Sequence, residues 1–209
     1  MILKVLVKII LLSLIAVVPF VVLIRGSVYL HKAYHFFPMA AIIGGFFLTC
    51  VILLFYVTFF FGPSRSFVAR LRLIILVLLF YGGYALLYLS AKNAKSDAVA
   101  RQYTSLHPVL RLGVSTILLI DKQMVITDAN RLPEDYQHMG LQQKSQSLHY
   151  RQSNGYVHAL DIRTNGRSAI RNFLLKWYFR AMGFGVIRHG GTGDHLHISL
   201  LSHDRPFAF

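Results

Sequence analysis

The sequence predicts an α+β protein in which three N-terminal transmembrane helices precede a small domain built on an antiparallel sheet. The first observation is the distribution of charge, because residues 1–91 contain no Asp or Glu and all eight acidic residues lie from Asp97 onward. The second is a set of three long apolar stretches within that acid-free region. The third is a C-terminal half in which short β-branched runs accompany one periodic helical segment. We therefore divide the chain into a membrane region (1–91), a tether (92–107) and a domain (108–209).

The three apolar stretches each reach or approach the roughly 20 residues that an α-helix needs to cross a bilayer. They are Val5–Ile24, Phe36–Phe61 and Leu73–Ser90. Glycine pairs at 44–45 and 82–83 fall within the second and third stretches, where small residues allow helices to approach closely. Cys50 is the only cysteine, so the sequence predicts no disulfide framework.

The orientation in the membrane follows from the first stretch and from the basic residues of the short loops. Lys4 and Lys8 could begin a signal peptide, but no Ala-x-Ala site follows the stretch, which favours a retained anchor. The N-terminal side carries Lys4, Lys8, Arg65, Arg70 and Arg72, and the opposite side carries Arg25, Lys32, Lys92 and Lys95. This small excess of positive charge predicts a cytoplasmic N-terminus and a C-terminal domain on the other side of the membrane.

The tether and the first part of the domain have a less regular pattern of apolar and polar residues. Residues 92–107 are polar and are typical of a short tether, with a helical tether as an open alternative. The apolar runs Ser115–Ile120 and Gln123–Thr127 are separated by Asp121-Lys122, a pattern that predicts a β-hairpin. The polar segment 128–146 is expected to be a loop or a short helix.

The clearest helix of the domain is predicted over Ser168–Met182. Apolar residues recur there at i, i+3 and i+4 spacing, which predicts a face packed on the core. These residues are Ile170, Phe173, Leu174, Trp177 and Ala181. Gly183 is placed to end the helix. Two strands, Gly185–Arg188 and His195–Leu201, are expected to follow.

Two histidines on the last expected strand are candidate metal ligands. His195 and His197 are two positions apart, and the side chains of a strand alternate between its faces. Both imidazoles should therefore leave one face, with Leu196 and Ile198 on the other. Neutral imidazole is the commonest protein ligand for zinc, so such a pair can begin a metal site.

Further candidate ligands lie about forty residues upstream. Asp161 stands in the strand-like run Tyr156–Ile162 between apolar neighbours, where an unpaired carboxylate would be costly unless it binds a cation or a hydrogen-bond donor. His149 ends a polar, turn-rich segment before that run. His149, Asp161 and His197 would supply three ligands and leave a fourth position for water, which is the arrangement of a catalytic zinc site.

These residues resemble a known family of zinc peptidases. Ser147, His149, Ala159 and Asp161 match the family pattern Ser-x-His-x-x-Gly-x-Ala-x-Asp, and the late ligand corresponds to His197. The family comprises D-Ala-D-Ala carboxypeptidases and dipeptidases with L-Ala-D-Glu endopeptidases, and it is related to lysostaphin-type peptidases and the hedgehog domain. The resemblance covers about residues 108–202. It implies Zn²⁺ as cofactor, peptidoglycan peptides as substrate, and a bacterial inner-membrane protein with a periplasmic domain.

The spacing departs from the family pattern at one point. The pattern separates its His and Asp by seven positions, whereas His149 and Asp161 are twelve apart. Residues Gln152–Gly155 could form a longer turn that leaves both ligands in place. His158 is the alternative ligand, although residues 158 and 161 of one strand point to opposite faces.

Two residues are candidates for the general base that the resemblance implies. Asp194 stands three positions before the last ligand, as in dipeptidase-like members, and a loop at Gly190–Gly193 could bring it to the metal. His195 corresponds to the first histidine of the His-x-His pair, which does this work in lysostaphin-like members. Of the two, Asp194 is the favoured base, with His195 stabilising the transition-state oxyanion. Three arginines near the ligands could hold a substrate carboxylate, and the sequence does not choose among Arg151, Arg163 and Arg188.

The formal net charge of +14 does not indicate a nucleic-acid partner. Nearly half of the basic residues flank the membrane segments, where they favour anionic headgroups, and no basic-aromatic stripe is present. The lipid bilayer and peptidoglycan peptides are the expected partners, and the sequence gives no oligomeric state. Two other functions stay open: a zinc-binding recognition domain that hydrolyses nothing, and a membrane-anchored sensor domain.

Overall fold

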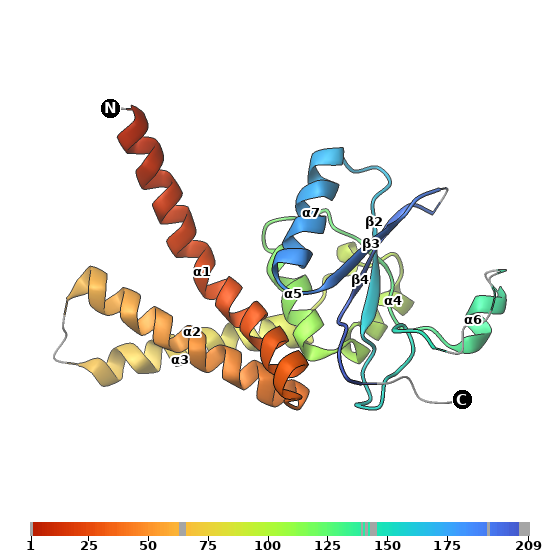
Figure 1. Cartoon of the computed structure of the whole chain (residues 1–209), viewed down its shortest axis with the longest axis horizontal. Helices are drawn as coiled ribbons and strands as arrows, with labels where there is room; N and C mark the ends of the chain where they lie inside the picture. The colour runs from red at the N-terminus through yellow and green to blue at the C-terminus, as the bar shows by residue number, and fades with distance from the viewer. Residues whose placement is uncertain are drawn as a thin grey trace.

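Three long apolar helices form the N-terminal half of the protein. The structure is a computed structural model that describes residues 2–62, 66–138, 140, 142, 146–191 and 193–204. The helices are α1 (Ile2–Tyr34), α2 (Pro38–Phe61) and α3 (Phe67–Leu87), and each is long and apolar enough to cross a membrane. In Figure 1, α2 and α3 run side by side and α1 meets them near the domain. Two residues used in the sequence analysis lie outside the described residues: Arg65, counted among the basic residues on the N-terminal side of the membrane, and Thr192, in the glycine-rich loop before β4.

Three of the four glycines named from the sequence, Gly44, Gly45 and Gly82, bring these helices together. A Cβ atom on Gly45 of α2 would collide with Ser27 Oγ and would lie 2.7 Å from the Leu23 carbonyl oxygen of α1. A Cβ atom on Gly82 of α3 would lie 2.8 Å from the Phe46 ring of α2. Larger residues at either position would push the helices apart.

The domain packs directly on the ends of the membrane helices. Helix α5 (Pro108–Leu118) lies between α3 and the sheet, and its Ser115 hydroxyl donates to the Ala85 carbonyl of α3 at 2.9 Å. The hydroxyl of Tyr103 lies 2.6 Å from Ser115 Oγ. Buried residues of α1, including Leu23 and Ile24, join the same apolar core as those of the domain. The membrane region and the domain therefore share one core.

The segment 92–107, for which the sequence predicted a tether, is folded onto the domain. It contains α4 (Asp97–Gln102) between the short 3₁₀ helices η1 (Ala91–Asn93) and η2 (Tyr103–Ser105). The buried Asn93 amide donates to the carbonyl oxygens of Lys122 and Met124 at 2.9 and 2.8 Å. These bonds satisfy backbone groups that would otherwise be buried without partners.

The predicted hairpin at 115–127 was wrong, because its first half belongs to helix α5. Pro108 occupies the first turn, where its fixed φ suits a helix, and the His107 ring accepts the Val109 N–H at 3.2 Å. Nearly every residue of α5 is buried, so its apolar run reflects burial on all sides and not a strand. Only the end of the second run pairs, as strand β1 (Ile126–Asp128).

The sheet has four antiparallel strands, which agrees with the predicted fold class. Strands β2 (Ala159–Arg163), β3 (Gly185–His189) and β4 (His195–Ser199) complete it in the order β1-β2-β4-β3. A short helix, α6 (Pro133–His138), follows β1. One face of the sheet joins the core through Leu160, Ile162, Leu196 and Ile198. The other face carries Asp161, His195 and His197 together with the exposed Ile187.

Helix α7 (Ala169–Ala181) confirms the predicted helix but not its predicted buried face. Gly183, with φ of +95°, follows its end as expected. The apolar stripe is exposed, with exposed fractions from 51% to 72% at Ile170, Phe173, Leu174 and Trp177. Leu175 and Phe179 on the opposite face pack on the core instead. The helix has two apolar faces, and periodicity alone cannot tell which one is buried.

Candidate metal centre

The register of the sheet places Asp161 opposite His197. These residues are direct partners across β2 and β4, and cross-strand partners share a face of the sheet. Asp161 Oδ1 lies 3.0 Å from His197 Nδ1. His195, two positions before His197, leaves the same face opposite Arg163, while Leu196 is buried on the other face. The alternation predicted from the sequence is therefore present.

The third predicted ligand, His149, reaches this face from the loop that precedes β2. Its Nδ1 lies 2.8 Å from the Ala129 carbonyl oxygen, which can only accept a hydrogen bond. The proton therefore belongs on Nδ1, and in the neutral ring Nε2 carries a lone pair. This Nε2 lies 3.1 Å from His197 Nδ1 and 3.4 Å from Asp161 Oδ1.

These three ligand atoms have the separations that a small metal ion requires. Ligand atoms of a tetrahedral zinc site, with bonds of about 2.0–2.1 Å, lie about 3.3 Å apart. The measured separations run from 3.0 to 3.4 Å. His149 and Asp161 are buried and His197 is partly exposed, so the group is accessible from one side. Metal-binding histidines usually donate their other N–H to an acceptor, as His149 does to Ala129.

The carboxyl of Asp161 stays ionised in this setting. Burial opposes its ionisation, but the neighbouring imidazoles of His149 and His197 and the charge of Arg131 outweigh burial and hold the pKa of Asp161 well below its usual range. An ionised carboxylate between two imidazoles is suited to a divalent cation.

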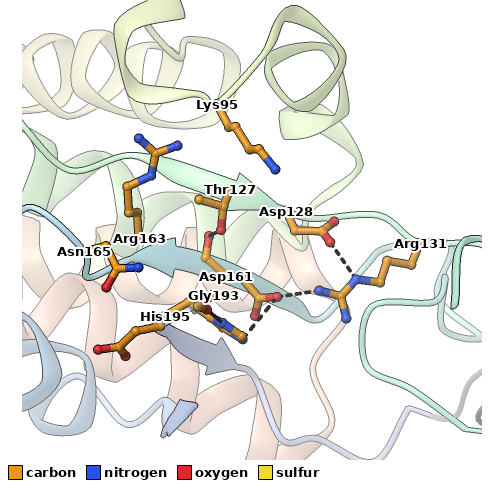
Figure 2. Close-up of a pocket in the computed structure, with 10 residues that line it drawn as sticks. Lys95, Thr127, Asp128, Arg131, Asp161, Arg163, Asn165, Gly193 and His195 are labelled. Atoms are coloured by element: carbon orange, nitrogen blue, oxygen red, sulfur yellow. Dashed lines mark hydrogen bonds and ion pairs between the residues drawn. The ribbon is translucent and has the colours of Figure 1, made fainter. Parts of the chain in front are cut away.

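Arg131 is a site residue that the sequence analysis missed. Its guanidinium donates to Asp161 Oδ2 and to Asp128 Oδ2, each at 2.6 Å, so it holds the oxygen of Asp161 that faces away from His197. Figure 2 shows Arg131 and His195 on either side of the Asp161 carboxylate. The two carboxylates raise the pKa of Arg131 despite its burial, which keeps its positive charge in place.

His195 has the geometry of a proton acceptor next to His149, Asp161 and His197, which we call the metal group. Its Nδ1 lies 2.6 Å from the Gly193 carbonyl oxygen, which assigns the proton of a neutral ring to Nδ1. Its Nε2 then presents a lone pair 3.7 Å from Asp161 Oδ2. The ring is more exposed than the three metal-site residues, so a substrate can reach it.

Asp194, the other candidate base, is engaged by Arg188. The guanidinium of Arg188 donates to both carboxylate oxygens, at 3.0 and 2.5 Å. These hydrogen bonds lower the pKa of Asp194 to about 2, so it is a poor proton acceptor near neutral pH. Arg188 was one of three arginines that the sequence suggested for binding a substrate carboxylate. Its guanidinium binds the Asp194 carboxylate in the structure.

His158, the alternative ligand, lies on the other side of β2 and does not join the group. It is fully buried, with Nδ1 3.3 Å from the Leu200 carbonyl oxygen and Nε2 3.0 Å from Asn154 Nδ2. Burial lowers the pKa of His158 to about 4, which keeps the ring neutral. Residues 152–155 form a turn with Gly155 at φ of +81°, so the extra residues lie outside the metal group.

Two hollows meet at the metal group. One, of about 430 Å³, has both cations and carboxylates on its wall: Lys95, Arg131 and Arg163 with Asp128, Asp161 and Asp194 (Figure 2). The other, of about 610 Å³, is lined by all three metal-site residues together with Tyr136 and Ile187. Arg131, Asp161 and His195 border both hollows. An extended substrate could therefore lie across the metal group.

No protein-family model, curated protein or solved structure matches this chain. The geometry of the site therefore carries the functional argument. Two imidazoles and a carboxylate around one small volume, with a third imidazole facing it, can hold a metal ion and move a proton beside it.

Proposed function

We propose that the protein is a membrane-anchored zinc metallopeptidase that hydrolyses peptide bonds of peptidoglycan. The observation that carries this proposal is the position of His195 Nε2, 3.7 Å from a carboxylate that belongs to a three-residue metal group. Zinc sites that only stabilise a fold almost always have four protein ligands, whereas a catalytic zinc site has three and an open position. The resemblance to the carboxypeptidase and endopeptidase family rests on the same residues.

The proposed roles of the residues follow from their contacts. Bound zinc would act as a Lewis acid that makes water nucleophilic near neutral pH and polarises the scissile carbonyl. His195 Nε2 accepts the proton of the attacking water and later delivers it to the leaving amine. The Gly193 carbonyl fixes the tautomer that leaves this nitrogen free to accept. Arg131 keeps Asp161 oriented toward the two imidazoles.

Two cations on the wall of the smaller hollow, Lys95 and Arg163, favour a substrate with a free carboxylate, although Asp128 and Asp194 line the same hollow. Figure 2 shows Lys95 above Thr127 and Asp128, and Arg163 on the same side of the hollow. A peptide that ends in D-Ala-D-Ala would place its terminal carboxylate among these cations and its remainder in the larger hollow. We therefore favour D,D-carboxypeptidase action over internal cleavage.

The proposed substrate determines the side of the membrane on which the domain must lie. Peptidoglycan lies outside the inner membrane of a bacterial cell, so the domain must be on the periplasmic side. The excess of basic residues on the N-terminal side of the membrane region supports this orientation. Arg25 and Lys32 of α1 lie near the domain end of that helix, and Arg25 donates to the Ala181 carbonyl of the domain at 2.5 Å.

The experiment that tests the function identifies the product. The full chain in detergent is incubated with muropeptides whose stem peptides end in D-Ala-D-Ala, and the products are analysed by mass spectrometry. Release of free D-alanine is expected, and His195→Ala should not release it. Release of a longer peptide would assign an endopeptidase, whereas intact muropeptides with zinc-loaded wild type would favour a recognition domain.

A further inference from the structure

A second group of imidazoles and a carboxylate lies where α1 joins the domain. His31 comes from the last turn of α1, and His203 and Asp204 follow strand β4. His31 Nε2 lies 3.2 Å from Asp204 Oδ2, and His203 Nε2 lies 3.8 Å from Asp204 Oδ1. One ligand atom from each residue lies within 4.8 Å of the others. None of these residues lines the two hollows beside His197.

The hydrogen bonding of His31 leaves a buried lone pair directed at this group. Its Nδ1 lies 2.8 Å from the Phe36 carbonyl oxygen, so the proton of the neutral ring belongs on Nδ1. Its Nε2 is buried and makes no hydrogen bond among the described residues. A lone pair and a carboxylate oxygen at 3.2 Å repel each other unless a proton or a metal ion lies between them. His149 has the same arrangement at the first site, with Ala129 in place of Phe36.

Neighbouring polar groups fix the orientation of Asp204. Asn154 Nδ2 and Ser202 Oγ each donate to its Oδ2 at 3.0 Å. Carboxylate ligands of metals are commonly held by such outer hydrogen bonds. The carboxylate is therefore oriented before any cation binds.

We propose that His31, His203 and Asp204 form a second metal site, which ties the chain after β4 to the outer end of α1. Two imidazoles and one carboxylate suit Zn²⁺ or a similar transition-metal ion, whereas Ca²⁺ and Mg²⁺ prefer oxygen ligands alone. One residue comes from the membrane region and two from the domain, so a metal ion bound here fastens the domain to α1. It does not depend on the peptidase proposal.

Zinc stoichiometry tests this second site. The full chain in detergent is dialysed against Zn²⁺, passed through a desalting column and analysed for metal by mass spectrometry. We expect two zinc ions in wild type, one in His203→Ala and one in His197→Ala. His35→Ala is the matched control, because the His35 ring stacks on His203 with centroids 4.1 Å apart but His35 is not in the ligand group.

The outcomes separate the two sites. His203 lies beyond the last strand, and retention of the zinc at His197 by His203→Ala would show that this variant is folded. Two zinc ions in His203→Ala, or one zinc ion in wild type that only His197→Ala removes, would overturn the second site. One zinc ion that only His203→Ala removes would support the second site and contradict the peptidase proposal.

An independent observation concerns the exposed apolar face of α7. Ile170, Phe173, Leu174 and Trp177 form this face, and all four are large and exposed. The C-terminal end of the helix contacts α1, because the Ala181 carbonyl accepts a hydrogen bond from Arg25. A Cβ atom on Gly183 would lie 3.0 Å from Val28 of α1. In Figure 1, α7 lies on the side of the sheet toward α1.

The charges of α7 suit an anionic membrane surface. The helix contains no acidic residue, and Arg171, Lys176 and Arg180 lie on its flanks, between the buried and exposed faces. Basic side chains beside an apolar face can extend to lipid headgroups, and tryptophan is enriched at this depth of the bilayer. Arg180 also lies over the Trp177 ring, 5.8 Å from its centroid. We infer that α7 lies in the membrane surface with this apolar face among the lipids.

Trp177 is the only tryptophan in the chain, so its fluorescence reports on this face directly. The full chain is reconstituted in vesicles of phosphatidylcholine and phosphatidylglycerol, with and without bromine on the acyl chains. We expect brominated lipid to quench most of the emission. The matched control is the double variant Trp177→Phe/Gln137→Trp, which moves the fluorophore to exposed α6, on the far side of the domain in Figure 1. Equal, weak quenching of both proteins would overturn the inference.

Discussion

Asp161 and His197 face each other across strands β2 and β4, and the Asp161 carboxylate lies 3.0 Å from the His197 ring nitrogen. Backbone pairing holds the Cβ atoms of cross-strand partners at a nearly constant distance, and Arg131 orients the carboxylate. His149 is different, since a loop carries it and a hydrogen bond to Ala129 orients its ring. The metal group therefore combines two residues on a rigid scaffold with a third that depends on loop structure.

The first prediction concerns metal content. Replacing Asp161 or His197 by Ala should remove most of the zinc bound at this site, because a three-ligand site tolerates little loss. His149→Ala should do the same, whereas His158→Ala should retain the metal, since His158 faces away from the group. Metal analysis of the four purified variants checks this. Zinc loss in His158→Ala with full occupancy in His149→Ala would reverse the assignment.

The second prediction assigns the base. His195→Ala should lower turnover by about 10²–10⁴-fold with zinc still bound, the usual effect of removing a positioned proton acceptor. Asp194→Asn should have a much smaller effect, because Asp194 is paired with Arg188. Turnover and zinc content are measured on the same preparations. A larger loss in Asp194→Asn would identify Asp194 as the base.

The third prediction is the pH dependence of the same variants. A pKa of about 2 leaves Asp194 ionised at every pH above that value, so its protonation cannot produce a fall in rate near neutral pH. Asp194→Asn should therefore keep the position of the acid limb in a plot of rate against pH. Disappearance of that limb in Asp194→Asn, with zinc retained, would show that Asp194 titrates in catalysis.

The fourth prediction concerns Arg131 as a positioning residue. Arg131→Ala should weaken zinc binding by about 10–100-fold, the usual effect of losing an outer contact to a metal ligand. The matched control is Arg163→Ala, because Arg163 lines the same hollow and is exposed. Competition with a chromophoric chelator measures both affinities. Equal affinities in the two variants would show that Arg131 does not support Asp161.

The fifth prediction is topological. A reporter that is active only outside the cytoplasm should be active when fused after Phe209 and silent when inserted at Ser64–Ser66. Phe209 and Ser64 lie outside the described residues, and Ser66 immediately precedes α3, so neither fusion interrupts a described helix or strand. The reverse pattern would place the domain in the cytoplasm and would exclude peptidoglycan as its substrate.

The parts that could be predicted from the sequence depend on local periodicity. The side-chain alternation at His195 and His197 needs only the geometry of a strand, and the membrane helices need only length and composition. Helix α5 was misread because a helix buried on all sides has the apolar run of a buried strand. The buried face of α7 was misassigned because both of its faces are apolar.

The remaining parts depend on contacts between distant segments. Arg131 lies 30 residues from Asp161, in an irregular segment with no periodic signal, and only folding brings the two together. The engagement of Asp194 by Arg188 depends on the turn between β3 and β4, which spacing in the sequence does not specify. The group at His31 joins residues more than 170 positions apart and has no local sequence pattern.

The release of D-alanine with zinc removed and then restored tests the central claim most directly. The full chain in detergent is given muropeptides ending in D-Ala-D-Ala, then a chelator, then Zn²⁺ in slight excess. We predict that zinc-loaded wild type releases D-alanine, that the chelator stops the release and that Zn²⁺ restores it, while His195→Ala stays inactive throughout. Intact muropeptides with zinc-loaded wild type, or cleavage that neither the chelator nor His195→Ala reduces, would contradict the proposal of a zinc peptidase.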